Sequence, residues 1–548
     1  MPTPHPRLFS RREWRIVSFA AALIMLLTTL PYLARAAATP DGRQFGGFVI
    51  GSEDGNSYLA KMRRGANSAW LFSLSYTAEP HAPAPLFLLH LALGKIGGAI
   101  TPPSDPNHWR TLLLIYHAAR LLFGFLALII TYRFAAAFIR PRPQRWIAFA
   151  LIALGGGLGW LILIGGEAAF DRYQPLDMMT PEAFTYLTLY AFPHLALARA
   201  ALFGGLLCLF RAAALPRQGA FRWALAAGLC WLIMAVLVSF YTGVIAAVLG
   251  GWGVLLWLRT RRLSLGLLWR CMVAGILPAL WTLYSALSIA RDPVLAGTLQ
   301  AQNVLLSPPP LSLLWAYGIL ALCALPALAL AWRRGGRDPR WLLPLAWVIL
   351  TPFLAYAPLP IQRRLLEGVW ASFVILGVIG LRLWWIALRR ALKRRIRWAW
   401  RVGVTGIVVV SLLTPFLVMG LAAFGSAGAG GIDQLYHPDG LLAALYWLDS
   451  HAEAGAVVLA STRRVGNLLP AFADVRAYIG HGVETLNALA KEDAVSALYA
   501  GRLSEQERSA LLASVDYWLF TPADPPPPDV GRVVYEAEGY VILTLRPR

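Results

Sequence analysis

The apolar residues of this chain fall into long runs that are separated by short polar or basic segments. A helix needs about 20 apolar residues to cross a hydrocarbon core of roughly 30 Å. The pattern therefore predicts a mostly α-helical, polytopic membrane protein with about eleven transmembrane helices. The expected spans lie near residues 14–34, 109–132, 146–164, 186–210, 223–239, 243–258, 267–289, 311–332, 341–357, 366–388 and 402–424.

Three apolar stretches need a further argument. The uncharged stretch 223–258 is interrupted at 239–243, where an outward turn makes it two helices. The run 85–100 is short and contains a histidine and a lysine, which favours a re-entrant or interfacial helix over a span. The first run resembles a signal peptide, but its apolar stretch is longer than the usual h-region of about 7–15 residues, so we expect it to be retained as a helix.

After the multi-span region 1–424, the composition changes to that of a soluble domain. A Gly/Ser/Ala-rich linker, 425–432, leads into the segment 433–548. There, short β-branched and aromatic runs predict strands, and helical spacing predicts helices, one of which opens with a Ser504/Glu507 capping box. We therefore expect a small α/β domain with strands at 457–460, 517–520, 533–535 and 540–545 and helices at 441–451, 489–499 and 504–514.

The composition supports the membrane assignment. The chain of 548 residues is 58% hydrophobic and 14% charged, against about 45–50% and 25% for soluble domains, and its mean hydropathy is +0.58. These values exclude a disordered chain, a coiled coil and a disulfide scaffold. The four cysteines all fall inside apolar runs without CxxC spacing, which indicates buried small side chains: Cys208, Cys230, Cys271 and Cys323.

The formal charge of +21 is distributed unevenly. Residues 433–548 carry fifteen acids against nine bases, a charge of −6, which leaves +27 for the rest of the chain. These bases stand in short clusters that alternate between the predicted spans, as the positive-inside rule requires, and not in a nucleic-acid patch. The N-terminus is then cytoplasmic, while the loops 35–108 and 165–185 and the C-terminal domain lie outside.

Two adjacent carboxylates, Glu53 and Asp54, stand in the outer loop that follows the first span. In one interpretation, Ser52 or Asp54 caps a short helix whose acids lie at its positive end and whose bases lie at its negative end. In the other, this pair beside the membrane carries out chemistry. Residue chemistry alone favours capping.

These features together resemble the integral-membrane glycosyltransferases of the GT-C fold, which use a polyprenyl-phosphate-linked sugar as donor. Members share about eleven or more helices, an inside N-terminus, an acidic pair in the first outer loop and often an outer C-terminal domain. Several short segments also look like those of uncharacterised bacterial members: YTAEPH at 76–81, TPEAF at 180–184, FPH at 192–194, SPPP at 307–310, PIQRR at 360–364, GNLLPA at 466–471 and YIGHGVET at 478–485.

The resemblance implies an inverting glycosyltransferase that acts at the outer face of a bacterial cytoplasmic membrane. It implies Asp54 or Glu53 as catalytic base or metal ligand, and it leaves a divalent cation open as a cofactor. This chemistry is coherent, because glycosyl transfer from a phosphate needs a base for the acceptor hydroxyl and cations where phosphate charge develops. The expected partners are the lipid-linked donor, membrane lipid and a glycan, lipid or protein acceptor, but no nucleic acid.

Arg363 and Arg364 are candidates for binding the donor phosphate. The alternation of basic clusters places them outside, against the bias that puts arginines inside. A guanidinium can bind phosphate through two parallel hydrogen bonds. The alternatives are interfacial snorkelling and an ion pair with Glu367.

Four further residues are weaker candidates for substrate or metal binding. Glu79 and His81 share the first outer loop, where a turn role is equally plausible. Glu182 belongs to an acidic second outer loop that we expect to be largely solvated. His194 lies in or near a predicted span, where polar groups are costly and often functional, although a helix–helix hydrogen bond is the alternative. In the tail, His481 and Glu484 follow a predicted strand, and a structural turn is the favoured role.

The competing functions are a transporter or lipid-linked-glycan flippase, and a non-catalytic membrane scaffold. Carriers tend to place ionisable residues at mid-span and to show inverted repeats, neither of which is prominent in this sequence. No P-loop, GxGxxG, HExxH, GxSxG or zinc-site spacing is present either.

Overall fold

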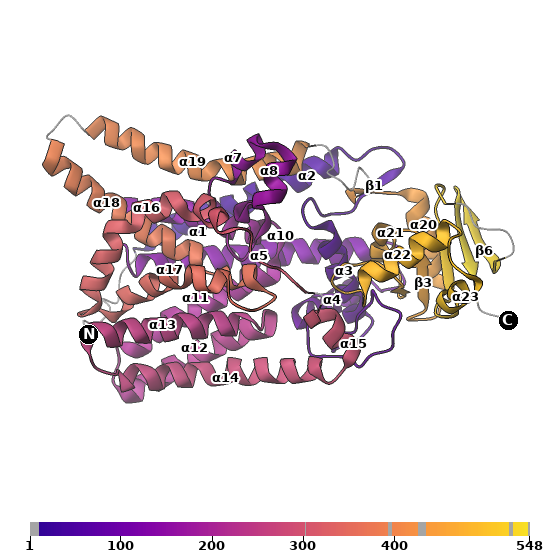
Figure 1. The fold of residues 1–548 in the computed structure, drawn as a ribbon, viewed down its shortest axis with the longest axis horizontal. Helices are drawn as coiled ribbons and strands as arrows, with labels where there is room; N and C mark the ends of the chain where they lie inside the picture. The colour runs from indigo at the N-terminus through magenta and orange to yellow at the C-terminus, as the bar shows by residue number, and fades with distance from the viewer. Residues whose placement is uncertain (1–9, 302, 393–396, 426–433, 525–529, 546–548) are drawn as a thin grey trace. The chain divides into compact units, whose positions relative to one another are not determined.

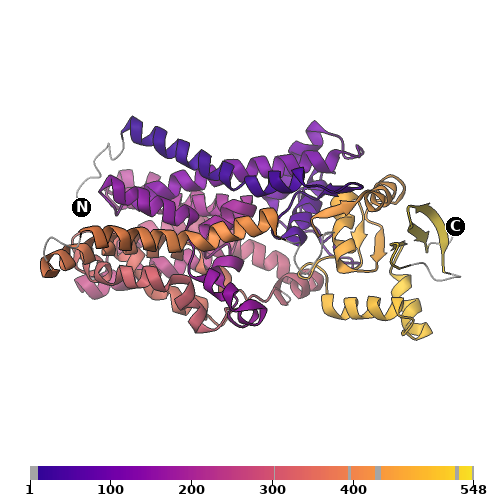
Figure 2. The ribbon, with the colours of Figure 1, turned by 90° about the horizontal axis from the view of Figure 1, so that it is seen from above.

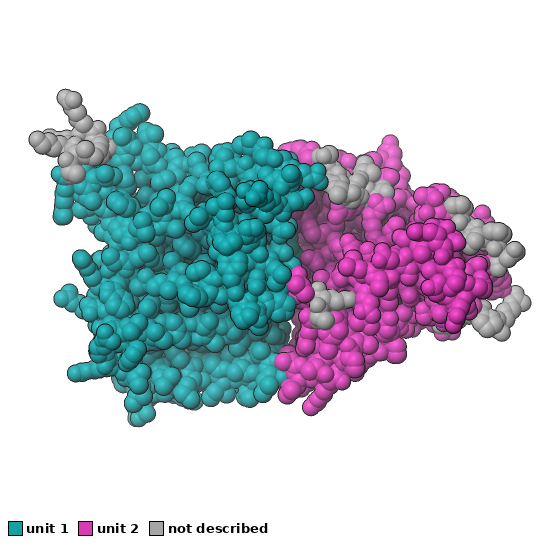
Figure 3. Space-filling view, in the orientation of Figure 1, with its two compact units in different colours: residues 1–30, 119–283, 305–421 teal, residues 31–118, 284–304, 422–548 magenta. Residues whose placement is uncertain are grey.

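The computed structural model describes residues 10–301, 303–392, 397–425, 434–524 and 530–545. Two compact units emerge from the contacts within the chain (Figure 3). Unit 1 comprises residues 1–30, 119–283 and 305–421, and unit 2 comprises residues 31–118, 284–304 and 422–548. The predicted linker 425–432 lies almost entirely outside the described residues, so the domain boundary there stays a prediction.

Unit 1 is built from helices. Its long helices run roughly along one common direction (Figures 1 and 2). The helices that belong wholly or mainly to it are α1 (Arg11–Leu27), α5 (His108–Ala136), α6 (Arg142–Leu154), α7 (Gly159–Ile164), α8 (Gly166–Tyr173), α9 (Leu176–Met179), α10 (Thr185–Ala191), α11 (Pro193–Ala213), α12 (Arg217–Leu237), α13 (Tyr241–Thr260), α14 (Leu265–Ala290), α16 (Pro310–Gly335), α17 (Leu342–Ala355), α18 (Val369–Leu392) and α19 (Arg397–Phe424), with the short 3-10 turn η3 (Gln362–Leu366) before α18.

Within the described residues, nine helices are long and apolar enough to cross a membrane. They correspond to nine of the eleven expected spans, and the residues 339–355 form a shorter apolar helix at the tenth. The expected span 146–164 is wrong as one continuous helix, because Gly155–Gly157 separate α6 from α7. Similarly, the expected span 186–210 is divided at Pro193, where α10 ends and α11 begins, since proline lacks the N–H that a continuous helix needs. The fold class is confirmed.

The apolar side chains of unit 1 point in two directions. Large aromatic residues such as Trp231, Trp252 and Trp347 are buried between its helices. On α14, by contrast, Leu268, Met272 and other apolar side chains at helical spacing are exposed. An exposed apolar stripe of this length is typical of a surface that faces lipid.

Unit 2 combines the first loop with the C-terminal segment. Its five-stranded sheet has the order β4-β3-β5-β7-β6, in which β3 runs parallel to β4 and β5 and the β5–β7–β6 neighbours are antiparallel. A separate antiparallel pair joins β1 to β2, with Gln44 opposite His437. The elements are α2 (Leu30–Ala37), β1 (Arg43–Phe45), α3 (Ser52–Ala66), α4 (Leu88–Ile100), α15 (Pro293–Leu295), β2 (Tyr436–Pro438), α20 (Asp439–His451), β3 (Val457–Ala460), α21 (Arg463–Phe472), β4 (Arg476–Ala477), α22 (Ala488–Tyr499), α23 (Glu505–Ala513), β5 (Tyr517–Phe520), β6 (Arg532–Ala537) and β7 (Tyr540–Thr544).

All four strands and all three helices predicted in the tail are confirmed. The capping box is present, because the Ser504 hydroxyl accepts from the Glu507 amide while the Glu507 carboxylate accepts from the Ser504 amide. The core of the sheet is built from Leu459, Trp518 and Leu543, which are buried. The helix α21 was not predicted, and it contains Pro470.

Candidate active site

Helix α3 begins at a glycine. Gly51 has a φ of +59°, a left-handed conformation that glycine adopts at little cost, and no side chain caps the helix in this described part of the chain. The interpretation of Ser52 or Asp54 as a cap is therefore wrong. Glu53 and Asp54 both lie in the first turn, where the positive end of the helix stabilises carboxylates. Neither carboxylate acts as the N-cap of the helix.

Helix α3 packs closely against α4 near its C-terminal end. A Cβ atom on Gly65 would lie 2.1 Å from the carbonyl oxygen of Leu91, and one on Gly94 would lie 1.8 Å from that of Met62. Both positions therefore require glycine. The apolar run at 85–100 contains the helix α4, which has 13 residues and packs against α3.

Asp54 is in contact with a histidine of the C-terminal segment. Its side chain is 52% exposed, and its Oδ1 lies 3.2 Å from Nε2 of His481, which is buried. The other ring nitrogen, Nδ1, accepts hydrogen bonds from the amides of Val483 and Glu484, each at 3.2 Å. Because Nδ1 is an acceptor, the ring carries its proton on Nε2 and donates it to Asp54.

Glu53 is bound differently from its neighbour. Its Oε1 accepts a hydrogen bond of 2.7 Å from the amide of Gly482 and lies 3.6 Å from Nε of Arg463. Arg463 also pairs with Glu492 at 3.1 Å. Glu53 is thus bound by a backbone amide and an arginine, whereas the Asp54 carboxylate accepts a hydrogen bond from the neutral imidazole of His481.

A buried ion pair lies further along α3. Nζ of Lys61 is 2.6 Å from Oε1 of Glu484, and the same oxygen accepts from the Ser57 hydroxyl at 2.7 Å. The ammonium group also lies 4.3 Å from the ring centroid of Phe87. Burial raises the pKa of the Glu484 carboxyl, but the charge of Lys61 and the hydrogen bonds from Lys61 and Ser57 outweigh this and leave the pKa below its usual range. Glu484 is therefore held as a carboxylate.

Two asparagines complete this contact. Nδ2 of Asn56 donates to Oδ1 of Asn467 at 2.9 Å, and Nδ2 of Asn467 donates to the Glu53 carbonyl at 3.2 Å. The Tyr76 hydroxyl donates to the carbonyl of Asn467 at 3.0 Å. A Cβ atom on Gly466 would lie 1.9 Å from the carbonyl oxygen of Ile479, so this glycine permits the approach of two segments. The structure thereby brings together three segments singled out in the sequence, 76–81, 466–471 and 478–485, with the acidic pair.

The remaining candidates of the first loop have their own partners. Glu79 pairs with Lys491, whose Nζ is 2.7 Å from Oε1, and also accepts from the hydroxyl of Thr77. Burial raises the pKa of Glu79, but the hydrogen bonds from Lys491 and Thr77 bring it below its usual range. In His81, Nε2 accepts from the Leu74 amide at 2.8 Å and Nδ1 lies 2.9 Å from the Glu79 carbonyl. Both nitrogens are thus used within the loop.

In unit 1, Arg363 and Arg364 lie in the turn η3. Glu367 does not pair with either of them, because its two carboxylate oxygens bind Arg199 at 2.5 and 2.7 Å. Arg364 lies instead with its Nε 3.8 Å from Oε1 of Glu182. The Nε of Arg363 is buried and has no hydrogen-bond partner among the described residues. The predicted alternative of an ion pair with Glu367 is therefore wrong.

The two proline-containing segments of unit 1 lie side by side. The Leu305 amide donates to the Pro360 carbonyl at 2.6 Å, and the Ser307 amide donates to Oε1 of Gln362 at 2.9 Å. The Tyr356 hydroxyl donates to the carbonyl of Pro308 at 2.8 Å. These contacts fix the turn that carries the two arginines.

The loop 165–185, which the arginine distribution predicts to lie outside, is only partly solvated, and this corrects the prediction of a largely solvated loop. Glu167 and Asp171 are exposed, but Asp177 and Glu182 are buried. Burial raises the pKa of Asp177 to about 6, and it also raises the pKa of Glu182, against the charge of Arg364. His194 is half-buried at the start of α11, with its ring centroid 6.1 Å from that of Phe192.

The acidic pair does not form a metal site by itself. Within the described residues, no group of three or more His, Cys, Asp or Glu side chains is placed to hold a metal ion. The two groups nearest to the acids cannot serve as metal ligands in this arrangement. The Gly482 amide donates its proton to Glu53, and the Nε2 of His481 donates its proton to Asp54, so neither nitrogen presents a lone pair to a cation beside the acids. The described residues therefore supply no complete set of protein ligands for a divalent cation.

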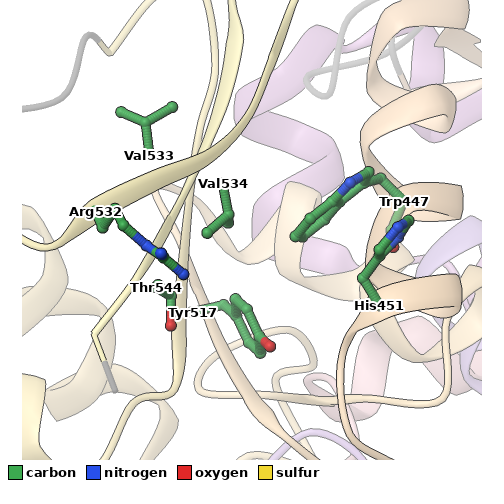
Figure 4. A pocket seen from close by; sticks show the side chains of 7 residues that line it. All are labelled: Trp447, His451, Tyr517, Arg532, Val533, Val534 and Thr544. Atoms are coloured by element: carbon green, nitrogen blue, oxygen red, sulfur yellow. The ribbon is translucent and has the colours of Figure 1, made fainter. Parts of the chain in front are cut away.

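A surface hollow of about 460 Å³ lies elsewhere in unit 2 (Figure 4). The rings of Trp447 and His451 stack on one side of it, with centroids 4.6 Å apart, and Arg532 and Val534 of β6 face them. None of the predicted site residues lines this hollow. It is separate from the acidic pair.

Sequence reasoning missed the residues that surround the acids. The sequence favours a structural turn for His481 and Glu484, and it does not single out Lys61 or Arg463 as site residues. The available signal was the close spacing of three polar residues, His481, Glu484 and Thr485, within the segment 478–485. Sequence spacing could not show that this run lies against α3.

The fold is similar to known structures. No protein-family model matches the sequence, and a comparison with curated proteins finds no match. Three solved structures of an oligosaccharyltransferase from Archaeoglobus fulgidus are similar: one tethered with an acceptor peptide that contains the NVT sequon (TM-score 0.60, 12% identity, 93% of this chain and 69% of that chain), one of AglB with an inhibitory peptide and a dolichol-phosphate (0.54, 13%, 93% and 70%), and one with Zn and sulfate (0.52, 13%, 92% and 68%). The chain therefore has the fold of a GT-C membrane glycosyltransferase.

Proposed function

We propose that this protein is a glycosyltransferase that moves a sugar or glycan from a polyprenyl-phosphate-linked donor to an acceptor at the outer face of a bacterial cytoplasmic membrane. The observation that carries this proposal is the half-exposed Asp54 carboxylate, presented at the start of α3 and held there by His481, in a chain of GT-C fold. Asp54 has the position in the first loop that the resemblance assigns to a catalytic carboxylate. The similar archaeal enzyme has been seen with a dolichol-phosphate and with an acceptor peptide, which supports a lipid-linked donor.

The transfer is a single displacement. The Asp54 carboxylate takes the proton of the acceptor hydroxyl, and the acceptor oxygen forms a bond to the anomeric carbon. The bond between that carbon and the phosphate oxygen breaks, and its electron pair leaves with the lipid phosphate. Attack from the face opposite the leaving group inverts the anomeric centre, and the negative charge of the site stabilises the oxocarbenium-like transition state.

Arg363 and Arg364 are the proposed ligands of the donor phosphate. The unsatisfied Nε of Arg363 retains a donor for an anion, and Arg364 is only loosely paired with Glu182 at 3.8 Å. Two guanidinium groups can bind phosphate oxygens in a fixed planar geometry. The same two arginines would also stabilise the charge that develops on the leaving group.

Glu79, His81, Glu182 and His194 remain proposed substrate contacts of lower weight. Glu79 and His81 are bound within the first loop, Glu182 faces Arg364 at 3.8 Å, and His194 lies beside Phe192 at the start of α11. We assign no step to a metal ion, because the described side chains do not gather the ligands that one requires.

The test uses the purified full-length protein in proteoliposomes with a panel of polyprenyl-phosphate sugars. Release of free polyprenyl phosphate, dependent on an added membrane extract that supplies the acceptor, is the expected result. Movement of the intact lipid-linked sugar across the bilayer without release of the phosphate would overturn the proposal in favour of a flippase. If the folded protein shows neither activity with any donor of the panel, the result would favour a non-catalytic membrane scaffold.

A further inference from the structure

The loop 480–485 of the C-terminal segment contacts both acids, and the function proposed above assigns it no step in the transfer. Gly482 binds Glu53 through its amide, and His481 binds Asp54 through its ring. Through these two contacts the loop forms part of the site around Glu53 and Asp54, which we call the acid site.

We propose that His481 is a positioning residue for Asp54, so that the C-terminal segment completes the acid site. The inference rests on the proposed function for the role of Asp54. It assigns a task to a residue 427 positions away in the sequence. It also separates the two acids, since only Asp54 is oriented by the imidazole.

The ring of His481 is fixed on every side. Its Nδ1 accepts from two amides of its own loop, which sets the ring plane and the tautomer. The hydroxyl of Thr485 accepts from the amides of Gly480 and His481 at 3.3 and 3.2 Å. The side chain of His481 is only 6% exposed, and its ring lies against the ring of Tyr76, with centroids 5.6 Å apart. A proton donor held this firmly can select one rotamer of a half-exposed aspartate.

The loop itself is anchored to α3. Glu484, three residues after His481, forms the buried pair with Lys61. Lys61 lies two turns after Asp54 on the same helix. The helix that carries the carboxylate and the loop that orients it are therefore joined at several points, among them Asp54 and Lys61. This rigidity is what a catalytic group needs, since a displacement of about 1 Å can reduce the rate by about a hundredfold.

Glu53 has a different role in this arrangement. Its carboxylate binds the Gly482 amide at 2.7 Å and faces Arg463, so its charge is used to hold the loop. Asp54 is the more exposed of the two side chains, at 52% against 40%. The geometry thus points to Asp54 as the base and to Glu53 as a structural acid.

Two substitutions separate the functions of the two ring nitrogens. In His481→Asn, the side-chain oxygen takes the place of Nδ1 and can accept from the loop amides, but the side chain is too short to reach Asp54. In His481→Gln, the longer side chain can place its amide N–H where Nε2 was and donate to Asp54, but it loses the Nδ1 acceptor. The matched control is His451→Asn, which changes an exposed histidine of the same unit outside the site.

Steady-state kinetics with proteoliposomes then decide the question. We expect His481→Asn to lower kcat by about ten- to a hundredfold with the donor KM within about twofold, and His481→Gln to restore most of the loss. His451→Asn should behave like the wild type. If Gln is as slow as Asn, or if the loss falls on KM, His481 has only a structural role in its loop and the inference is wrong.

A failure of the proposed function gives a different result. In that case the wild type itself transfers no sugar, and the contact is read by ¹⁵N NMR of the imidazole, assigned by comparison with His481→Asn. We expect the Nε2–H tautomer, with an Nε2 shift that moves in Asp54→Ala. An imidazole whose shifts do not respond to Asp54→Ala would overturn the positioning role whether or not the protein is an enzyme.

Discussion

Oδ1 of Asp54, at the start of α3, and Nε2 of His481, in the loop after β4, lie 3.2 Å apart although 427 positions separate them in the sequence. A span or loop on the other side of the membrane could not make this contact. The strand pair β1–β2, which joins residues 43–45 to residues 436–438, imposes the same constraint. Residues 35–108 and 433–548 must therefore lie on one side, and the distribution of arginines predicts that this is the outer side.

The first prediction concerns this topology. In a background without the four native cysteines, Asn107→Cys and Arg502→Cys should react with a membrane-impermeant maleimide added to intact cells. Arg337→Cys, in a predicted cytoplasmic loop, should react only after the membrane is opened. All three positions are exposed. Labelling of Arg337→Cys alone in intact cells would show that the orientation is reversed.

The second prediction is that Asp54→Asn abolishes transfer while the protein stays folded. Asparagine keeps an oxygen that can accept from His481, so the variant loses the negative charge and little else. The loss of stability should stay below about 1 kcal/mol, because no side-chain cap is removed. Transfer rate per folded molecule is the measurement.

Asp41→Asn provides the control for Asp54→Asn. Asp41 is an exposed acid of the same loop, so this variant makes the same change of charge away from the site. It should keep full activity. An active Asp54→Asn would remove Asp54 from the chemistry.

The third prediction concerns the buried pair of Lys61 and Glu484. Lys61→Met leaves the Glu484 carboxylate buried without its cation, which should lower the free energy of unfolding by about 3–5 kcal/mol. Replacing both residues by Met should restore much of the stability, because no unpaired charge remains. Arg508→Met breaks an exposed pair with Glu505 and should change the stability by less than about 1 kcal/mol. Thermal unfolding in detergent compares the variants.

The pH dependence of this stability has a defined sign. The pKa of Glu484 is lower in the folded protein than in the unfolded chain, where it is about 4.3. Its contribution is therefore complete above pH 4.3 and is lost as the pH falls through the folded value. The wild type should lose stability below about pH 4 more steeply than Glu484→Gln, which carries no titrating group at this position. Parallel acid titrations of Tm would reveal equal slopes if the pair is not formed.

Hydrophobic patterning predicted most of the fold but not its interruptions. Run length identifies a span, because the bilayer requires about 20 apolar residues. It does not show that Gly155–Gly157 end a helix, since glycine is also tolerated inside apolar runs. In the tail, β-branched runs gave the strands, whereas α21 was missed because Pro470 argues against a helix.

The site was predicted in part. The acidic pair stood out because acids are rare in this chain, and Gly51 before it is the glycine that starts α3. The partners His481, Glu484 and Arg463 are distant in sequence, and their contacts depend on how the tail folds. Sequence also suggested Glu367 as a partner of the arginines, but the buried Arg199 is its partner, a choice that only side-chain packing can determine.

The last prediction concerns Arg363 and Arg364. If they bind the lipid phosphate, replacing either by Lys keeps the charge but loses the planar fork, so donor affinity should fall by about tenfold. Replacing both by Gln should remove donor binding, because an anion that leaves water for a buried pocket needs compensating charge. Arg172→Lys, at an exposed position of the second outer loop, should bind donor like the wild type. Since Glu367 is paired with Arg199, these effects cannot arise from a lost pair with Glu367.

If the two arginines only snorkel to the membrane interface, either Lys variant should bind donor like the wild type, because Lys reaches an interface as well as Arg does. Donor titration of both single Lys variants decides between them, and unchanged affinity in both would exclude the phosphate assignment.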